Sequence, residues 1–283
     1  MAEDGIESPA FDPDEVLRVA DDRFAPESTA VVTGAASGIG RATALALAAN
    51  GLTVVATDVD EAGVEETAGR AADLDAAGTV EPVGADLLDD DAAIAVVEAA
   101  AERGDLRFLA NVAGMQHVAP LESFPMDVYD RMHRVMLRAP LLLSKHALPH
   151  VRAAGGGAIG NMASVHGHYV TADKVAYNVV KFGIRGLTQS IAAEGDGVVR
   201  GFSVSTGYVA TPLVTDQIPD TAEQRGISER AVVEDVMLGQ ARSTEMMTPV
   251  DVANLFVLGF SKHGRHLNGG DLLFDGGMTL TYE

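Results

Sequence analysis

Short runs of apolar and β-branched residues alternate with alanine-rich stretches along most of this 283-residue chain. The apolar runs occupy 29–34, 52–58, 79–86, 106–114, 155–164, 201–209 and 271–277. The stretches between them have helical composition, most clearly at 126–153, 175–194 and 250–260. Near-continuous apolar strands separated by helices are typical of a parallel sheet that is covered on both faces. The pattern therefore predicts one doubly wound α/β domain with a parallel seven-stranded sheet.

Two segments depart from this alternation. Residues 1–27 are polar, proline-containing and aperiodic, so we interpret them as an N-terminal extension lying on or beside a single domain at 28–283. Residues 208–246 contain helix breakers and helical pieces but no strand pattern. Long insertions after a strand of an open α/β sheet commonly form binding loops. We therefore expect this second segment to close over a substrate.

The charge balance limits the possible partners. The formal net charge is −21, and the 20 basic residues comprise 4 lysines and 16 arginines. Such an acidic surface repels nucleic acid and anionic lipid, so we expect neither a nucleic-acid nor a membrane partner. It suits a medium of very high salt, where the Debye length falls to ~3 Å. The composition resembles that of proteins from extreme halophiles, and an ordinary acidic protein is the alternative.

Cysteine is absent, which excludes disulfides and thiolate chemistry and fits a reducing cytoplasm. The first residues carry acids and prolines where a signal peptide needs basic and apolar residues. No stretch approaches the ~18 consecutive apolar residues of a membrane span. We therefore expect a cytoplasmic protein.

A glycine-rich turn follows the first apolar run. Gly34, Gly38 and Gly40 lie where the backbone must turn tightly and approach a pyrophosphate at a helix N-terminus. Asp58 ends the second run, 18 residues beyond Gly40, where a carboxylate accepts hydrogen bonds from ribose hydroxyls and repels a 2′-phosphate. The glycine-rich turn together with Asp58 favours NAD over NADP as cofactor. A plain strand-to-helix turn, with Asp58 as a helix cap, is the alternative interpretation.

Tyr177 and Lys181 are four residues apart within a predicted helix, so they share one face. An ammonium beside a phenol stabilises the phenolate and lowers the tyrosine pKa from ~10 toward working pH. Ser164 ends the preceding apolar run and is placed to donate to a carbonyl oxygen as negative charge develops on it. A surface helix pair is the alternative for Tyr177 and Lys181.

These motifs together resemble the short-chain dehydrogenase/reductase family over residues 29–279, including the element Asn111-Val112-Ala113-Gly114. The resemblance implies a Rossmann-type domain, direct hydride transfer and the catalytic residues Ser164, Tyr177 and Lys181, with no metal. It also implies a homotetramer built from the long helices. The implied cofactor-binding residues are Gly34, Ser37, Gly38, Ile39, Gly40, Asp58, Asp86, Leu87, Asn111, Ala113, Tyr177, Lys181, Val209 and Thr211.

The chain departs from the family pattern at two places. Met136 stands where the family has a catalytic asparagine, and a thioether cannot orient the water thought to link the lysine to solvent. Either a neighbouring polar group substitutes for the asparagine or the proton relay is impaired. Ser205-Thr206-Gly207 replaces the usual Pro-Gly.

Further side chains resemble those of the D-3-hydroxybutyrate dehydrogenase subfamily. Residues matching Gln116, His166, Lys174 and Gln217 grip the substrate carboxylate in that subfamily, and Tyr208 takes the place of an aromatic pocket wall. A short hydroxy acid offers few atoms, so a charged and hydrogen-bonding clamp must orient it. We therefore expect reversible NAD-dependent oxidation of D-3-hydroxybutyrate to acetoacetate, with a small anionic hydroxy acid as partner. Each clamp residue is alternatively an ordinary loop or strand-end polar residue.

Three other functions use the same residues. Reduction of a 3-oxoacyl thioester such as acetoacetyl-CoA needs the same serine, tyrosine and lysine, but it predicts NADPH, which Asp58 disfavours. A weak NAD-binding sensor, inactivated at Met136, is the second. A hydrolase using Ser164 and His166 is the third, although Ser164 lacks the Gly-x-Ser-x-Gly nucleophile elbow.

Overall fold

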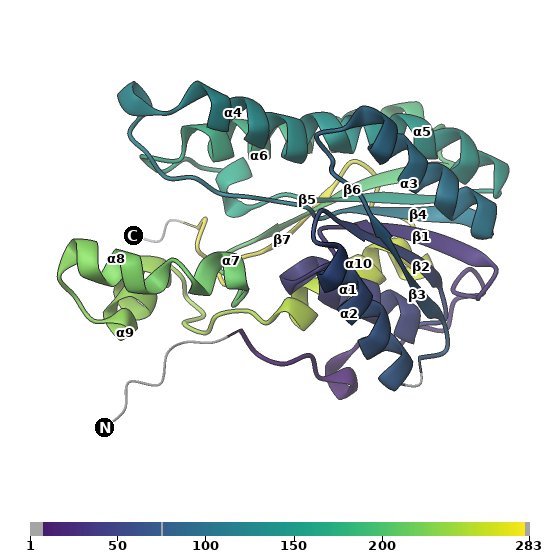
Figure 1. The fold of residues 1–283 in the computed structure, drawn as a ribbon, viewed down its shortest axis with the longest axis horizontal. Coiled ribbons are helices and arrows are strands. Elements are labelled where there is room, and N and C mark those ends of the chain that lie inside the picture. The colour runs from purple at the N-terminus through teal and green to yellow at the C-terminus, as the bar shows by residue number, and fades with distance from the viewer. Residues whose placement is uncertain (1–7, 75, 281–283) are drawn as a thin grey trace.

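The computed structural model describes residues 8–74 and 76–280 (Figure 1). Seven parallel strands form one sheet in the order β3-β2-β1-β4-β5-β6-β7. Their bounds are Ser28–Thr33 (β1), Thr53–Asp58 (β2), Thr79–Gly84 (β3), Asp105–Asn111 (β4), Gly157–Met162 (β5), Val199–Thr206 (β6) and Asp271–Phe274 (β7). The predicted doubly wound α/β domain is confirmed. The order of strands reverses between β1 and β4, and ligands of such sheets bind beyond the strand ends at this reversal.

Helices cover both faces of the sheet (Figure 1). One layer consists of α1 (Gly38–Ala49), α2 (Glu61–Asp73) and α10 (Pro249–Phe260). The other consists of α3 (Asp90–Arg103), α5 (Ala139–Ala153) and α6 (Val175–Glu194). Ala30 and Val32 of β1 pack into the first layer, whereas Val31 packs into the second. Burial on both faces explains why the strand sequences are continuously apolar.

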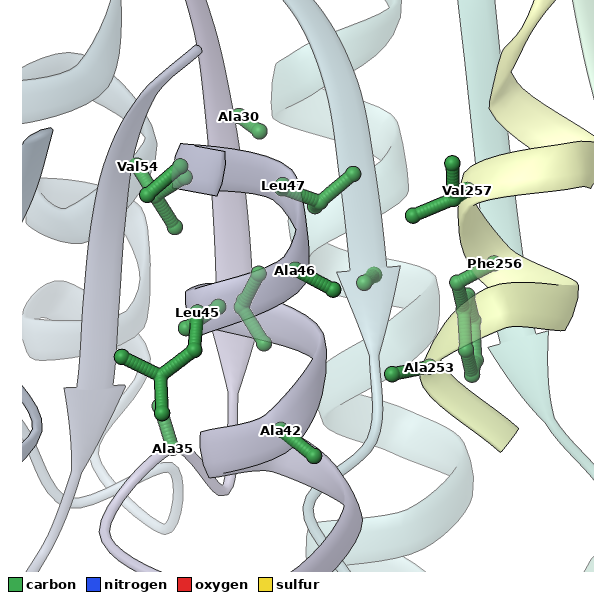
Figure 2. Packing of buried hydrophobic residues seen from close by; sticks show 14 of the residues in the cluster. Ala30, Ala35, Ala42, Leu45, Ala46, Leu47, Val54, Ala253, Phe256 and Val257 are labelled. Carbon is green, nitrogen blue, oxygen red and sulfur yellow. The ribbon is translucent and has the colours of Figure 1, made fainter. Parts of the chain in front are cut away.

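Small side chains bring α1 close to α10. Figure 2 shows Ala42 and Ala46 of α1 facing the part of α10 that carries Ala253 and Phe256. All four side chains are at most 3% exposed. Because alanines let the two helices approach closely, α1 is held against the sheet on one side and against α10 on another, and its N-terminus stays at the end of β1.

The helix predicted at 126–153 is interrupted. It consists of α4 (Met126–His133), a π-helical turn at Arg134–Arg138 and α5. Such π turns are rare and often lie at functional sites. The turn contains Met136. The periodicity of the sequence does not predict this π-helical turn.

The segment 208–246 forms short helices beyond the strand ends, shown in green in Figure 1. They are α7 (Pro212–Thr215), α8 (Ile218–Arg225), α9 (Glu229–Ala231) and a π-helical turn at Val232–Met237. These pieces share a small apolar cluster that includes Ile218, Val232 and Leu238. The segment therefore has a core of its own.

The remaining short helices are single 3-10 turns at Pro13–Glu15, Leu121–Ser123, Val165–Gly167 and Lys262–Gly264. Within the N-terminal extension, Val16 and Phe24 are buried in the cluster shared with α1 and α10. Among the described residues, no helix is long and apolar enough to cross a bilayer.

Candidate active site

The turn between β1 and α1 has room for glycine only. A Cβ on Gly40 would lie 2.0 Å from the carbonyl oxygen of Gly34, and one on Gly34 would lie 2.7 Å from Cα of Ala113. Gly34 and Gly38 also have positive φ angles of 69° and 50°. The bare backbone of this turn and the N-terminus of α1 fit a pyrophosphate, as the sequence predicts.

A cleft of about 330 Å³ begins at this turn and runs between β2, β4 and the start of α7. Ten of the expected cofactor-binding residues line it: Gly34, Ser37, Gly38, Ile39, Gly40, Asp58, Asp86, Leu87, Ala113 and Thr211. Asp58 accepts a hydrogen bond from the Ala36 amide at 3.2 Å, so its carboxylate is fixed at the end of β2. The shape and lining of the cleft fit a dinucleotide.

The other four expected cofactor-binding residues are not in the lining of this cleft: Asn111, Tyr177, Lys181 and Val209. The Asn111 side chain is buried and donates to Oδ1 of Asn161 at 2.8 Å, while its own Oδ1 has no hydrogen-bond partner among the described residues. Asn161 in turn donates to Thr188 at 2.9 Å. Asn111 thus connects β4 to β5 and α6 in addition to its expected role.

Ten further residues line the cleft that were not assigned to the cofactor from the sequence, and eight of them lie within two positions of one that was. The other two come from a separate helical segment. Arg131 and Val135 come from α4 and the π-helical turn, on the side of Leu87 and Met115. Whether these two side chains face the cleft depends on how the helix is rotated about its axis relative to the sheet. The sequence does not indicate that rotation.

Ser164, Tyr177 and Lys181 meet at the carboxyl end of β5. Ser164 follows β5, and its side chain forms a hydrogen bond with Tyr177. The Lys181 ammonium lies 5.3 Å from the centre of the Tyr177 ring and donates to the Met162 carbonyl at 2.8 Å. Lys181 is 4% exposed. The expected face-sharing of tyrosine and lysine on α6 is therefore present in the structure.

The electrostatics of this group differ from the expectation that Lys181 lowers the pKa of Tyr177. Burial raises the pKa of Tyr177, and the hydrogen bond from Ser164 opposes this only in part. Burial also lowers the pKa of Lys181 to about 8. Desolvation is the largest cause of both shifts, because burial disfavours the charged form of each group. The expected lowering of the Tyr177 pKa is therefore wrong for this structure.

Met136 is buried beside the same group, with its sulfur 3.5 Å from the amide nitrogen of Met115. It packs in a cluster with Ala176 and Val180 of α6. The thioether accepts a weak hydrogen bond from the loop that follows β4 and offers no donor. That loop, at 112–116, is therefore anchored to the π-helical turn.

His166 and Lys174 lie on the loop between β5 and α6. The two ring nitrogens of His166 lie 3.4 Å from the Ser164 hydroxyl and 3.1 Å from the Thr171 hydroxyl. The Lys174 ammonium lies 5.9 Å from the centre of the Tyr208 ring. Burial lowers the pKa of Lys174, and burial together with the charges of Lys174 and Lys181 lowers the pKa of His166 to about 4. His166 is therefore neutral at pH 7.

The two glutamines of the expected clamp lie on separate loops and meet. Gln116 Nε2 donates to Gln217 Oε1 at 3.4 Å, although the two residues are 101 positions apart. The loop of Gln116 also lies beside Lys174, because the Ala119 amide donates to the Asp173 carbonyl at 2.9 Å. All the expected substrate-binding residues therefore come from loops at one end of the sheet.

Tyr169 is a neighbour of His166 that sequence reasoning missed. Its ring stacks on His166 with centroids 5.5 Å apart. Burial and the neighbouring Tyr208 and Asp275 raise the pKa of its phenol. Its place three residues after His166 gives little indication of this contact, because the path of an irregular loop cannot be deduced from its sequence. Tyr169 and Tyr208 pack against the same apolar cluster, and Tyr208 lies beside Lys174.

We predict that His166 makes the protein sensitive to mild acid. The folded protein holds the His166 pKa at about 4, below the ordinary 6.5, so the unfolded chain binds more protons between these values. Stability from this group is fully present above pH 6.5 and is lost as the pH falls toward 4, by up to about 3 kcal/mol. Urea unfolding at pH 7, 5.5 and 4.5 should show a steeper loss in the wild type than in His166→Gln. Parallel losses in the two proteins would contradict the prediction.

Comparison with known proteins agrees with this geometry. Residues 28–222 match the family model for short chain dehydrogenase. The chain is 36% identical to D-beta-hydroxybutyrate dehydrogenase of Rhizobium meliloti over 258 residues, 89% of this chain and 98% of that protein. It is 29% identical to the 3-oxoacyl-[acyl-carrier-protein] reductase FabG of Thermotoga maritima, over 88% and 97% of the two chains.

A solved structure shares the fold. The putative NAD(P) dependent gluconate 5-dehydrogenase of Beutenbergia cavernae, with bound NADP, superposes with a TM-score of 0.80 at 30% identity. The match covers 91% of this chain and 99% of that one. The sheet, the cleft and the family match lead to one conclusion: this chain is an NAD(P)-binding oxidoreductase that belongs to the short-chain dehydrogenase family.

Proposed function

We propose that the protein oxidises D-3-hydroxybutyrate to acetoacetate with NAD, reversibly. The observation that carries this proposal is the partly buried ammonium of Lys174 beside His166, at the loop that leads from Ser164 to Tyr177. In a chain of net charge −21, an anionic substrate needs a local cation, and Lys174 and Lys181 are two of only four lysines. The 36% identity to a D-beta-hydroxybutyrate dehydrogenase supports the same substrate class.

In the proposed reaction, some side chains bind the substrate carboxylate and others act on its hydroxyl group. Lys174, His166 and the two glutamines hold the carboxylate, which fixes the position of the hydroxyl-bearing carbon. Ser164 donates a hydrogen bond to the substrate oxygen, and Tyr177 exchanges the proton of that oxygen. In the reduction the Tyr177 phenol gives the proton; in the oxidation the phenolate takes it, and because burial raises the Tyr177 pKa the phenolate fraction is small and grows with pH. The Lys181 ammonium stabilises that phenolate and holds the nicotinamide ribose. When bound, the cofactor supplies the acceptor for the hydride leaving the substrate carbon.

The choice of NAD over NADP rests on the end of β2. Asp58 lines the cleft there, and the next residue, Val59, is 70% exposed and carries no charge. A carboxylate at this place accepts hydrogen bonds from ribose hydroxyls and repels a 2′-phosphate. The proposal therefore includes a preference for NAD.

The same proposal includes a homotetramer in a reducing cytoplasm. Leu141 of α5 is 54% exposed, and Val179 and Phe182 of α6 are 45% and 46% exposed. Apolar side chains gathered on long helices are suited to contact with further copies of the chain, which supports a homotetramer. The absence of cysteine supports a reducing cytoplasm.

Thioester reduction is the second candidate, favoured by the similarity to FabG.

We expect turnover of D-3-hydroxybutyrate with NAD to exceed turnover with NADP, and the L-enantiomer and 3-hydroxybutyryl-CoA to be poor substrates. Absorbance of the reduced cofactor gives kcat/KM for each pair, measured in molar KCl. Activity confined to the thioester and NADP would overturn the proposal. Loss of all turnover with intact NADH binding would favour a sensor.

We predict a clear split between two variants. Lys174→Ala removes a cation that holds the substrate carboxylate in both ground and transition state, so KM for hydroxybutyrate should rise about tenfold or more with a smaller change in kcat. Tyr177→Phe removes the proton acceptor, so kcat should fall at least about a hundredfold. Lys262→Ala, at an exposed lysine remote from the site, is the matched control. Equal effects of Lys174→Ala and Lys262→Ala would contradict the clamp.

We also propose that the protein is adapted to high salt. Self-repulsion at a net charge of −21 is screened as the Debye length falls from ~10 Å at 0.1 M to ~3 Å at 1 M salt. The melting temperature should therefore rise by about 10 °C or more between 0.1 and 3 M KCl. Sucrose at matched osmolality tests for general exclusion from the surface, and it should have the smaller effect. A melting temperature that is highest in 0.1 M KCl would contradict halophilic adaptation.

A further inference from the structure

Residues 8–19, here called the N-terminal strap, lie along the layer formed by α1 and α10. Val16 is 6% exposed, and Phe11 and Val19 pack against the same apolar cluster. Figure 1 shows this purple segment on the side of the sheet that carries α1, α2 and α10. The strap is therefore packed on the domain.

Two asparagine side chains fix the register of the strap. Asn254 of α10 accepts from the Leu17 amide at 2.7 Å and donates to the Glu15 carbonyl at 2.9 Å. Asn50, at the end of α1, accepts from the Val19 amide and donates to the Leu17 carbonyl, both at 2.9 Å. Each amide thus replaces a strand partner for the extended backbone. A strap held at 15–19 delivers the residues before it to a defined place.

That place is the loop between β6 and α7. The Ser8 hydroxyl donates to the Ala210 carbonyl at 2.7 Å, across 202 positions of sequence. Ala210 is 8% exposed, and its amide donates to the Met247 carbonyl at 2.8 Å. Both polar groups of this residue are therefore satisfied, one of them by the strap.

The Ala210 carbonyl belongs to the same planar peptide unit as the Thr211 amide. The Thr211 amide donates to the Val209 carbonyl at 2.8 Å. The peptide unit between Ala210 and Thr211 is therefore held at both edges, by Val209 at its N–H and by Ser8 at its carbonyl oxygen. Thr211 lines the cofactor cleft, and its methyl group lies 3.2 Å from where a Cβ on Gly38 would stand. Holding this peptide plane fixes Thr211 against the glycine-rich turn.

The strap lies outside the part of the chain that matches the family model, which begins at residue 28. The match to the Rhizobium meliloti protein covers 98% of that protein and leaves about a tenth of this chain unmatched. The Ser8 side of the contact with Ala210 is thus not part of the family match.

We propose that the N-terminal strap is a positioning element of the cofactor site, in which Ser8 holds the Ala210–Thr211 peptide and so orients Thr211 toward the nicotinamide end of the cleft. Ser8 acts through Thr211 and touches no reacting atom. The strap reaches the cleft through Thr211, whereas Asp58 and Asp86 are the lining residues expected at the adenosine end. Its loss should weaken the grip on nicotinamide and leave the grip on the adenosine half unchanged.

The test compares Ser8→Ala with Ser190→Ala in the full chain. Ser190 is the matched control, because its exposed hydroxyl also donates to a backbone carbonyl, that of Gly186 at 3.0 Å, within α6. NADH and ADP-ribose, which lacks nicotinamide, are titrated calorimetrically without substrate, so the result does not depend on the proposed hydroxy acid. Ser8→Ala should raise Kd for NADH about fivefold and leave Kd for ADP-ribose within about twofold.

Hydrogen exchange supplies a second measurement. Amides of 209–213 should exchange faster in Ser8→Ala than in the wild type, with melting temperatures within about 2 °C of each other. Ser190→Ala should match the wild type in every respect. The proposal is overturned if Ser8→Ala binds NADH like the wild type, if ADP-ribose weakens as much as NADH, or if exchange at 209–213 is unchanged.

Discussion

The tight packing of the β1–α1 turn is the constraint on which the rest of the site depends. Gly40 lies against the Gly34 carbonyl at a distance that excludes any side chain. This contact places the N-terminus of α1 at the reversal of strand order between β1 and β4. Alanines of α1 then let α10 pack closely beside it (Figure 2). The cofactor cleft is consequently part of the packing of the core and not an addition to its surface.

The sequence predicted the sheet because burial on both faces leaves continuous apolar runs. It also predicted half of the residues that line the cleft and the meeting of Ser164, Tyr177 and Lys181, since glycine spacing and the i, i+4 relation are local. It could not predict the rotation of α4 that brings Arg131 to the cleft, or the π-helical turn around Met136. It also failed on the Tyr177 pKa, because desolvation depends on how the whole loop region packs.

Function here is achieved at a cost in stability. Burial lowers the Lys181 pKa from 10.5 to about 8, which corresponds to about 3 kcal/mol of disfavoured charge. Lys174 and His166 are desolvated in the same way, so a cluster of basic groups is held together inside an acidic protein. On the proposed function, a bound carboxylate relieves the repulsion between the ammonium groups of Lys174 and Lys181, since His166 is neutral at pH 7. The groups that hold the anion would then be in place before it binds, which reduces the reorganisation needed for reaction.

In the proposed function, Lys174, His166 and Gln116 hold the carboxylate of a small hydroxy acid while Ser164 and Tyr177 face its oxygen-bearing carbon. A crystal structure of the protein with NAD and acetoacetate would test this arrangement. We expect the acetoacetate carboxylate within hydrogen-bonding distance of the Lys174 ammonium, with the keto oxygen between the Ser164 and Tyr177 hydroxyls. A carboxylate bound away from Lys174, or a keto oxygen that faces neither hydroxyl, would contradict it.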